Sequence, residues 1–194
     1  MKNINFQDKL TEAAGIYSAI AGDPAIAVAL ANATDLCVDC LRAGGKILFC
    51  GNGGSAADAQ HLAAELSGRF YFDRPPLFAE ALHVNTSYLT AVANDYGYEN
   101  VFSRLVQAKG RKGDVLVGLS TSGSSENIVQ AIHQAKEQKM HIVTMTGGAP
   151  SLMSELTDVS LAVPSTDTPR IQEGHILLGH LLCGAIESRL FTQK

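Results

Sequence analysis

Five short apolar runs alternate with helix-length segments along most of this chain. The runs occupy residues 46–50, 78–83, 114–119, 141–146 and 158–163. Strands separated by helix-length segments pair in parallel through right-handed crossovers, which place helices on both faces of the sheet. The alternation therefore predicts an α/β fold, a three-layer doubly wound sandwich built on a five-stranded parallel sheet.

Helical spacing of apolar residues occurs before and after this alternation. Residues 6–43 show it twice, with a break at Gly22-Asp23-Pro24, where Asp23 can cap a helix and Pro24 suits its first turn. A last helix is expected from about Pro169 to Leu190. Because no linker interrupts the chain, we expect an N-terminal helical segment at 1–44, packed on the core or on a neighbouring subunit, and a sheet domain at 45–194.

Composition and charge exclude several classes of function. With 194 residues, 46% of them hydrophobic and 18% charged, the chain can bury one sizeable core. Its formal net charge is −4 and it has no run of Lys or Arg, so neither nucleic acid nor a membrane surface is an expected partner. The start MKNINFQDKL lacks the apolar stretch of a signal peptide, and uninterrupted apolar runs such as 25–31 are too short to span a bilayer. We therefore expect a cytoplasmic protein whose four cysteines are reduced core residues.

Two loops rich in glycine and serine follow the first and third predicted strands. They read Gly51-Asn52-Gly53-Gly54-Ser55 and Ser120-Thr121-Ser122-Gly123-Ser124-Ser125. Glycines let backbone amides approach a ligand, hydroxyls donate hydrogen bonds, and the helix N-termini that follow favour negative charge. In a flavodoxin-like strand order these two strands are neighbours at the switch point where ligands bind. The loops are thus expected to form one cradle for phosphate or hydroxyl groups, although a tight turn alone would explain either loop taken singly.

Two nucleotide-dependent functions fit the glycine loop poorly. The segment 51–56 matches the dinucleotide fingerprint G-x-G-x-x-A, but that motif requires an acidic residue about 20 positions later, at the end of the second strand. Here the second predicted strand ends in Leu82-His83-Val84-Asn85. The chain also has no Walker A sequence, which disfavours nucleoside triphosphate hydrolysis.

Titratable residues gather in two predicted helices. His61 and Glu65 are four residues apart, so they share one helical face and can bind one metal ion or substrate. The last predicted helix carries His175, for which a hydrogen-bonded core position is the simpler interpretation, and His180. His180 interrupts an apolar stretch, where an unpaired imidazole is costly, so it requires a partner.

Four segments of the chain are similar to one known family. They are CGNGGSAADAQHLAAELSGRF, AVANDYGYENVFSR, KGDVLVGLSTSGSSENIVQAI and PRIQEGHILLGHLL. They resemble the phosphoheptose isomerases, a branch of the sugar isomerase (SIS) domain family, and the resemblance covers nearly the whole chain. It implies a flavodoxin-like SIS fold and a zinc-binding homotetramer with active sites at subunit interfaces. The implied reaction is the aldose–ketose isomerisation of D-sedoheptulose 7-phosphate to D-glycero-D-manno-heptose 7-phosphate, the entry to ADP-heptose and the lipopolysaccharide inner core.

The resemblance also implies the functional residues, with one Zn²⁺ per subunit. The implied metal ligands are His61, Glu65, Gln172 and His180, and the implied acid/base pair is Glu65 and His180. The substrate contacts, to which we add Ser55, are Asn52, Gly53, Gly54, Ser55, Glu65, Asn94, Asp95, Ser120, Thr121, Ser122, Ser125 and Gln172. Some isomerases of the family have an acidic residue directly before the Arg-Ile-Gln segment, where this chain has Pro169, with Asp167 two residues earlier.

The spacing of the ligands leaves alternatives open. Gln172 and His180 would lie about 12 Å apart along an unbroken helix. Either that helix breaks near Gly174 or Gly179, or the ligands converge from different subunits. A zinc-bound carboxylate is also a poorer base, so Glu65 either changes its role during turnover or has only one of the two.

Two functions other than catalysis are compatible with the same fold. One is a non-catalytic SIS-domain protein that associates with the replication initiator. Such proteins generally lack the acidic residue at the position of Glu65 and the second histidine of the last helix, both of which this chain has. The other is a sugar-phosphate sensor, which would bind the ligand without turnover.

Overall fold

A five-stranded parallel sheet forms the centre of the molecule. The computed structural model describes residues 4–192 of the chain. Its strands are β1 (Ile47–Gly51), β2 (Ala79–Ala81), β3 (Val115–Leu119), β4 (His141–Gly147) and β5 (Val159–Val163). They are ordered β2-β1-β3-β4-β5, and every neighbouring pair is parallel. This order is flavodoxin-like, and it confirms the predicted fold class.

Each strand begins within one residue of its predicted start. The largest difference is at β2, which ends at Ala81 instead of residue 83. β2 is an edge strand that pairs only with β1, and the chain leaves the sheet there toward the next helix. The apolar run was longer than the strand because Leu82 is buried in the core beyond the end of the ladder.

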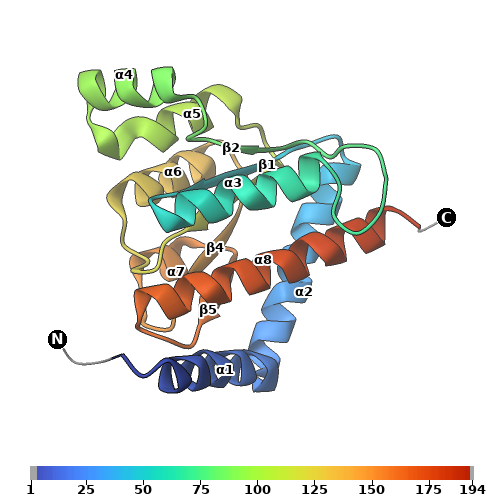
Figure 1. The fold of residues 1–194 in the computed structure, drawn as a ribbon. Helices are drawn as coiled ribbons and strands as arrows, with labels where there is room; N and C mark the ends of the chain where they lie inside the picture. The colour runs from blue at the N-terminus through green and yellow to red at the C-terminus, as the bar shows by residue number, and fades with distance from the viewer. Residues whose placement is uncertain (1–3, 193–194) are drawn as a thin grey trace.

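Helices cover both faces of the sheet (Figure 1). One face is covered by α1 (Phe6–Gly22), α2 (Pro24–Arg42), α3 (Gly54–Ser67) and α8 (Thr168–Leu190), and the other by α4 (Thr86–Tyr96), α5 (Val101–Lys109), α6 (Glu126–Glu137) and α7 (Leu152–Leu156), with the short 3₁₀-helix η1 (Tyr98–Asn100) between α4 and α5. Successive side chains of β1 point to opposite faces of the sheet, so this strand contributes to both cores. Ile47 and Phe49 belong to the first core, whereas Leu48 and Cys50 belong to the second.

The N-terminal segment consists of two helices that differ in burial. The break lies where the sequence predicts it, because the Asp23 side chain accepts a hydrogen bond from the Ala25 amide at 2.8 Å. α2 packs against β5 and α8, and its Cys37 and Val38 side chains are fully buried. α1 lies at the margin of the molecule, and its Phe6 remains 76% exposed.

α2 also meets the length and composition of a membrane span. It is the one helix within residues 4–192 to do so, with a mean hydropathy of 1.4 over 18 residues. The sequence expectation missed it because it considered the apolar run 25–31, which Asn32 ends. The inner face of α2 is part of the core, and a core helix passes the same test as a span.

All four cysteines are buried and unpaired, in agreement with their predicted place in the core. Cys37 and Cys40 lie on the inner face of α2. Burial raises the pKa of the Cys50 thiol to about 12 and that of Cys40 to about 11. A thiol that stays protonated is a poor nucleophile and metal ligand, so these cysteines serve the packing of the core.

α8 is continuous from Thr168 to Leu190, so a break near Gly174 or Gly179, one of the two alternatives left open by the sequence, does not occur. Both glycines instead allow close packing inside the chain. A Cβ atom at Gly174 would lie 2.6 Å from the Val163 side chain, and one at Gly179 would lie 2.6 Å from that of Leu62. These glycines bring α8 close to β5 and α3, which is a different role from contact across a subunit interface.

Candidate active site

Three serine hydroxyls converge at the start of α6. Ser120 Oγ lies 2.8 Å from Ser125 Oγ and 3.2 Å from Ser122 Oγ. Ser125 is the N-cap of α6, but its side chain makes no capping bond to the helix. The first amides of a helix lack intrahelical partners and favour an anion. We call Ser120, Ser122 and Ser125 the serine cradle, because their hydroxyls and these amides form a site suited to phosphate.

Backbone geometry explains the glycine inside this loop and the place of Thr121. Gly123 has a φ of +63°, and a Cβ there would lie 2.3 Å from Ser151 Oγ. No other residue fits this position without strain. Thr121 and Ser122 line a cavity of about 230 Å³ together with Ser165 and Thr168. Both residues are therefore accessible to a ligand from the carboxyl ends of the strands.

The glycine loop is joined to the serine cradle by a pair of amides. Asn52 and Asn127 each donate to the other's side-chain oxygen at 2.9 Å, and the Tyr98 hydroxyl donates to Asn52 Oδ1 at 3.1 Å. Asn127 is buried and lies in the first turn of α6. The expectation that the two loops meet at the β1–β3 switch point is confirmed. Sequence reasoning missed Asn127 and Tyr98, although both lie in segments that carry the family resemblance, because nothing in the sequence marks them as partners of Asn52.

The start of α3 brings in a residue from α8. Gly53 has a φ of +56°, and a Cβ at Gly54 would lie 2.5 Å from the Gln172 side-chain nitrogen. Gln172 is therefore adjacent to the glycine loop. Ser55 is buried beneath this loop, and its backbone lies against Gly51, where a Cβ would come within 2.4 Å of the Ser55 carbonyl oxygen.

Three of the four expected metal ligands come together between α3 and α8. His61 Nε2 lies 2.9 Å from His180 Nε2 and 3.2 Å from Glu65 Oε1. All three donor atoms lie within 4.8 Å of one another. His61 is thus the partner that the apolar surroundings of His180 require. We call His61, Glu65 and His180 the His/Glu cluster.

The donor set of this cluster fits a divalent cation. Two imidazole nitrogens and one carboxylate oxygen are ligands that suit zinc, with a fourth position left for another group. The two Nε2 atoms face each other at hydrogen-bond distance, where only one of them can carry the shared proton. The ring of Phe70 covers one side, with its centroid 5.7 Å from that of His180. His61 itself is exposed, so the cluster is open to a ligand or to another subunit.

Gln172 is not part of the cluster within one chain. Because α8 is unbroken, the eight residues between Gln172 and His180 span about 12 Å. One chain's Gln172 therefore cannot share an ion with its own His180. Convergence of ligands from different subunits is the alternative that remains open from the sequence.

Asn94 and Asp95 lie apart from the cluster as well. Both are exposed near the end of α4, on the opposite face of the sheet from α3 and α8 (Figure 1). The Asn94 amide donates to Asp95 Oδ1 at 2.8 Å. Within residues 4–192 no hydrogen bond or ion pair joins either residue to the serine cradle or the His/Glu cluster, although η1, which follows α4, reaches the glycine loop through the Tyr98–Asn52 hydrogen bond.

Two further titratable residues lie close to the site. His175 is fully buried, with Nε2 3.1 Å from the Thr146 carbonyl oxygen, and burial lowers its pKa to about 4. It is a hydrogen-bonded core residue. Asp58, one turn before His61, is half-buried; burial raises its pKa, and the neighbouring His61 opposes this effect.

Comparisons with known proteins agree with the fold. The model of the SIS domain matches residues 17–147, which is more than half of the chain and includes both loops and two residues of the cluster. The chain is thus a SIS-domain protein by its architecture and its sequence.

Several similar proteins are named phosphoheptose isomerases. A phosphoheptose isomerase of Burkholderia pseudomallei is 51% identical over 187 residues, which are 96% of this chain and 95% of the relative. One of Rhodospirillum rubrum is 56% identical over 164 residues, covering 84% and 87% of the two chains. The solved phosphoheptose isomerase of Neisseria gonorrhoeae is 43% identical and superposes with a TM-score of 0.87, covering 95% of this chain and 100% of that one. The chain belongs to the phosphoheptose isomerase family.

Proposed function

We propose that this protein is an aldose–ketose isomerase that converts D-sedoheptulose 7-phosphate to D-glycero-D-manno-heptose 7-phosphate through an enediolate. One observation carries the proposal. A cluster able to move protons and bind a cation lies between α3 and α8, α3 begins at the glycine loop that the Asn52–Asn127 pair joins to the phosphate-type cradle, and relatives of nearly full length are named for this activity. The alternative of an initiator-associated binding protein receives no support from the relatives.

The serine cradle would hold the phosphate of the substrate. Its hydroxyls and the free amides at the start of α6 suit the three phosphate oxygens, and the remote phosphate supplies binding energy that positions the reacting end. Asn52, fixed by Asn127 and Tyr98, and the Gly53 and Gly54 amides would contact the sugar hydroxyls. The glycine loop thus leads from the cradle to α3.

Glu65 and His180 would move the protons. Isomerisation removes a proton from C1 of the ketose and adds one at C2, while a second proton passes between the two oxygen atoms. A carboxylate and an imidazole held in one cluster can divide these transfers between a base at carbon and an acid at oxygen. The half-burial of both side chains limits competition from water.

We further propose that the cluster holds one Zn²⁺ per subunit. His61, Glu65 and His180 would be its ligands in one chain, with Glu65 changing its role during turnover, and Gln172 would come from a neighbouring subunit of a homotetramer. When bound, zinc would polarise the carbonyl and hydroxyl oxygens of the substrate. The exposure of His61, Asn94 and Asp95 supports a site completed by another subunit. We assign the enzyme to the cytoplasm and to the pathway toward ADP-heptose and the lipopolysaccharide inner core.

Incubation with D-sedoheptulose 7-phosphate in deuterated water, followed by NMR, tests this function. The expected product carries solvent deuterium at C2, and a chelator should suppress its formation. Glu65→Gln is the inactive comparison. Folded, zinc-loaded protein that yields neither product nor exchange would contradict the isomerase and favour a sensor.

A further inference from the structure

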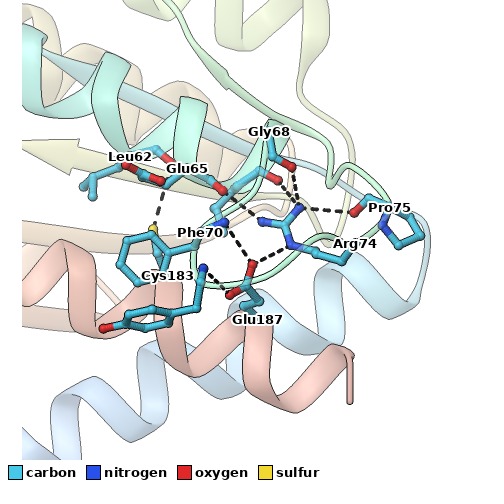
Figure 2. A network of polar contacts seen from close by, with 10 residues as sticks. Leu62, Glu65, Gly68, Phe70, Arg74, Pro75, Cys183 and Glu187 are labelled. Atoms are coloured by element: carbon cyan, nitrogen blue, oxygen red, sulfur yellow. Dashed lines mark hydrogen bonds and ion pairs between the residues drawn. The ribbon is translucent and has the colours of Figure 1, made fainter. Parts of the chain in front are cut away.

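The loop between α3 and β2 contains a buried ion pair that the reaction itself does not use. Residues 68–78 have no regular secondary structure, yet the side chains of Arg74 and of Glu187, in α8, are only 1% and 0% exposed. Arg74 Nε donates to Glu187 Oε1 at 2.9 Å (Figure 2). The pair therefore connects this loop to a helix more than 100 residues later in the chain.

Arg74 also caps the end of α3. Its guanidinium donates to the carbonyl oxygens of Leu66 at 2.8 Å, Glu65 at 2.9 Å and Gly68 at 3.1 Å (Figure 2). The last carbonyl groups of a helix lack intrahelical partners, and a cation there is favourable. Because one of these carbonyls belongs to Glu65, Arg74 fixes the backbone of a residue in the His/Glu cluster.

Glu187 holds the other end of the arrangement. Its carboxylate accepts hydrogen bonds from the backbone amides of Phe70 at 3.0 Å and Tyr71 at 2.7 Å, in addition to the one from Arg74. Glu187 lies about two turns after His180 on α8. The carboxylate thereby holds Phe70 where its ring lies beside the His180 imidazole.

We propose that Arg74 and Glu187 are positioning residues that fix Glu65 and His180 relative to one another and so set the affinity of the cluster for its metal ion. The proposal rests on the function given above. It follows from the connections: one partner binds the backbone of Glu65 on α3, and the other lies on the helix of His180 and orients Phe70. Groups that orient metal ligands from outside the coordination sphere commonly change metal affinity or activity 10- to 100-fold when they are removed.

Stability alone does not account for ions at this place. Buried ion pairs can often be replaced by apolar residues of similar volume without loss of stability. An apolar residue cannot donate to the carbonyl groups of Glu65, Leu66 and Gly68, whereas the planar guanidinium does so while it binds Glu187. The Arg74–Glu187 pair is therefore suited to fix the relative positions of Glu65 and His180.

The test compares variants of this pair with a matched control. Arg74→Lys and Glu187→Gln weaken the connection, and the double variant Arg74→Met/Glu187→Leu removes it without leaving a buried unpaired charge. Asp114→Asn is the control, because it breaks the other well-buried pair, Lys46–Asp114, whose side chains are 15% and 3% exposed. The hydrogen bonds of Asp114 go to Lys46 and Arg111, which belong to neither α3 nor α8.

The measurements are the Zn²⁺ dissociation constant by chelator competition, the absorption spectrum of the Co²⁺-substituted protein, and kcat and KM. We expect zinc affinity to fall about 10- to 100-fold in the double variant, with an altered cobalt spectrum. kcat should fall with it, while KM stays within about twofold because the serine cradle is at the start of α6. Arg74→Lys should lie between native and double variant, and Asp114→Asn should bind zinc as the native protein does.

Two results would overturn the proposal. One is native zinc affinity and a native cobalt spectrum in the folded double variant. The other is an equal loss of affinity in Asp114→Asn, which would reduce the pair to a general stabilising contact. Failure of the proposed function is distinguishable, since it would be seen as native protein that binds zinc, responds to these substitutions and does not isomerise the sugar phosphate.

Discussion

The serine cradle takes its three hydroxyls from residues 120–125, whereas the His/Glu cluster joins His61 to His180, 119 residues later. The hydroxyls of the cradle all come from one chain, and the start of α6 is joined to the glycine loop by the partly buried pair Asn52–Asn127. The cluster is open on one side and lacks the fourth expected ligand. A local turn can therefore build the binding half of a site, while the reacting half depends on the packing of two helices.

The largest expected effect is the loss of turnover, without loss of binding, when a residue of the His/Glu cluster is replaced. Glu65→Gln or His180→Gln should lower kcat by about 10³- to 10⁴-fold, because each removes a group that moves a proton. Binding of the sugar phosphate, measured by calorimetry, should change little since the serine cradle is intact. His133→Gln, a change at an exposed histidine of α6, is the control. Appreciable turnover in either active-site variant would contradict the acid/base assignment.

Removal of the metal ion should separate the same two regions without a mutation. Dialysis against a chelator should lower turnover about 100- to 1,000-fold, and added Zn²⁺ should restore it. The metal-free protein should still bind the sugar phosphate through the cradle. An equal loss of binding and turnover would instead mean that the two regions form one inseparable unit.

Low pH should destabilise the protein through His175, which is buried in α8. Between pH 6.5 and about 4 the unfolded chain binds a proton at His175 that the folded chain does not, so stability falls as the pH falls through this window. The full effect is about 3 kcal/mol. The free energy of unfolding, measured with urea at several pH values, should depend less steeply on pH in His175→Gln than in the native protein. His133→Gln should show the native pH dependence. A curve for His175→Gln as steep as the native curve would refute the neutral imidazole.

The smallest effect concerns a single hydroxyl of the cradle. Ser122→Ala should raise KM about tenfold with little change in kcat, since it removes one hydrogen bond to a charged group. Ser124→Ala, in the same loop but outside the cradle, should have a smaller effect. An unchanged KM for Ser122→Ala would argue against phosphate binding at this place.

The parts of the fold that could be predicted are those determined by residues close together in the sequence. The strand starts, the helix break at Asp23 and the meeting of two loops follow from apolar periodicity, capping and strand order, each of which is written in adjacent residues. The site was only partly accessible. Asn127 pairs with Asn52 across 75 positions and Arg74 with Glu187 across 113, and no pattern in either segment marks its partner.

The ligand set shows the same limit from another side. The spacing of Gln172 and His180 correctly indicated that one helix could not bring both to one ion. It could not decide between a break and a second subunit, because glycines at 174 and 179 fit both. The structure resolves the first alternative through the packing of those glycines on Val163 and Leu62.

The distance between α3 and α8 at the active site depends on the absence of a Cβ atom at Gly179. The separation of α3 and α8 next to His180 is limited by Leu62, which leaves no room for a Cβ. In a saturation library selected for activity, position 179 should accept only glycine. Position 184, where a Cβ would meet the rings of Tyr71 and Phe70 at 3.1 Å and 3.3 Å, should accept alanine, because these rings would need to move by only a few tenths of an ångström. Two glycines about one and a half turns apart on the same helix would thus differ greatly in the substitutions that they tolerate.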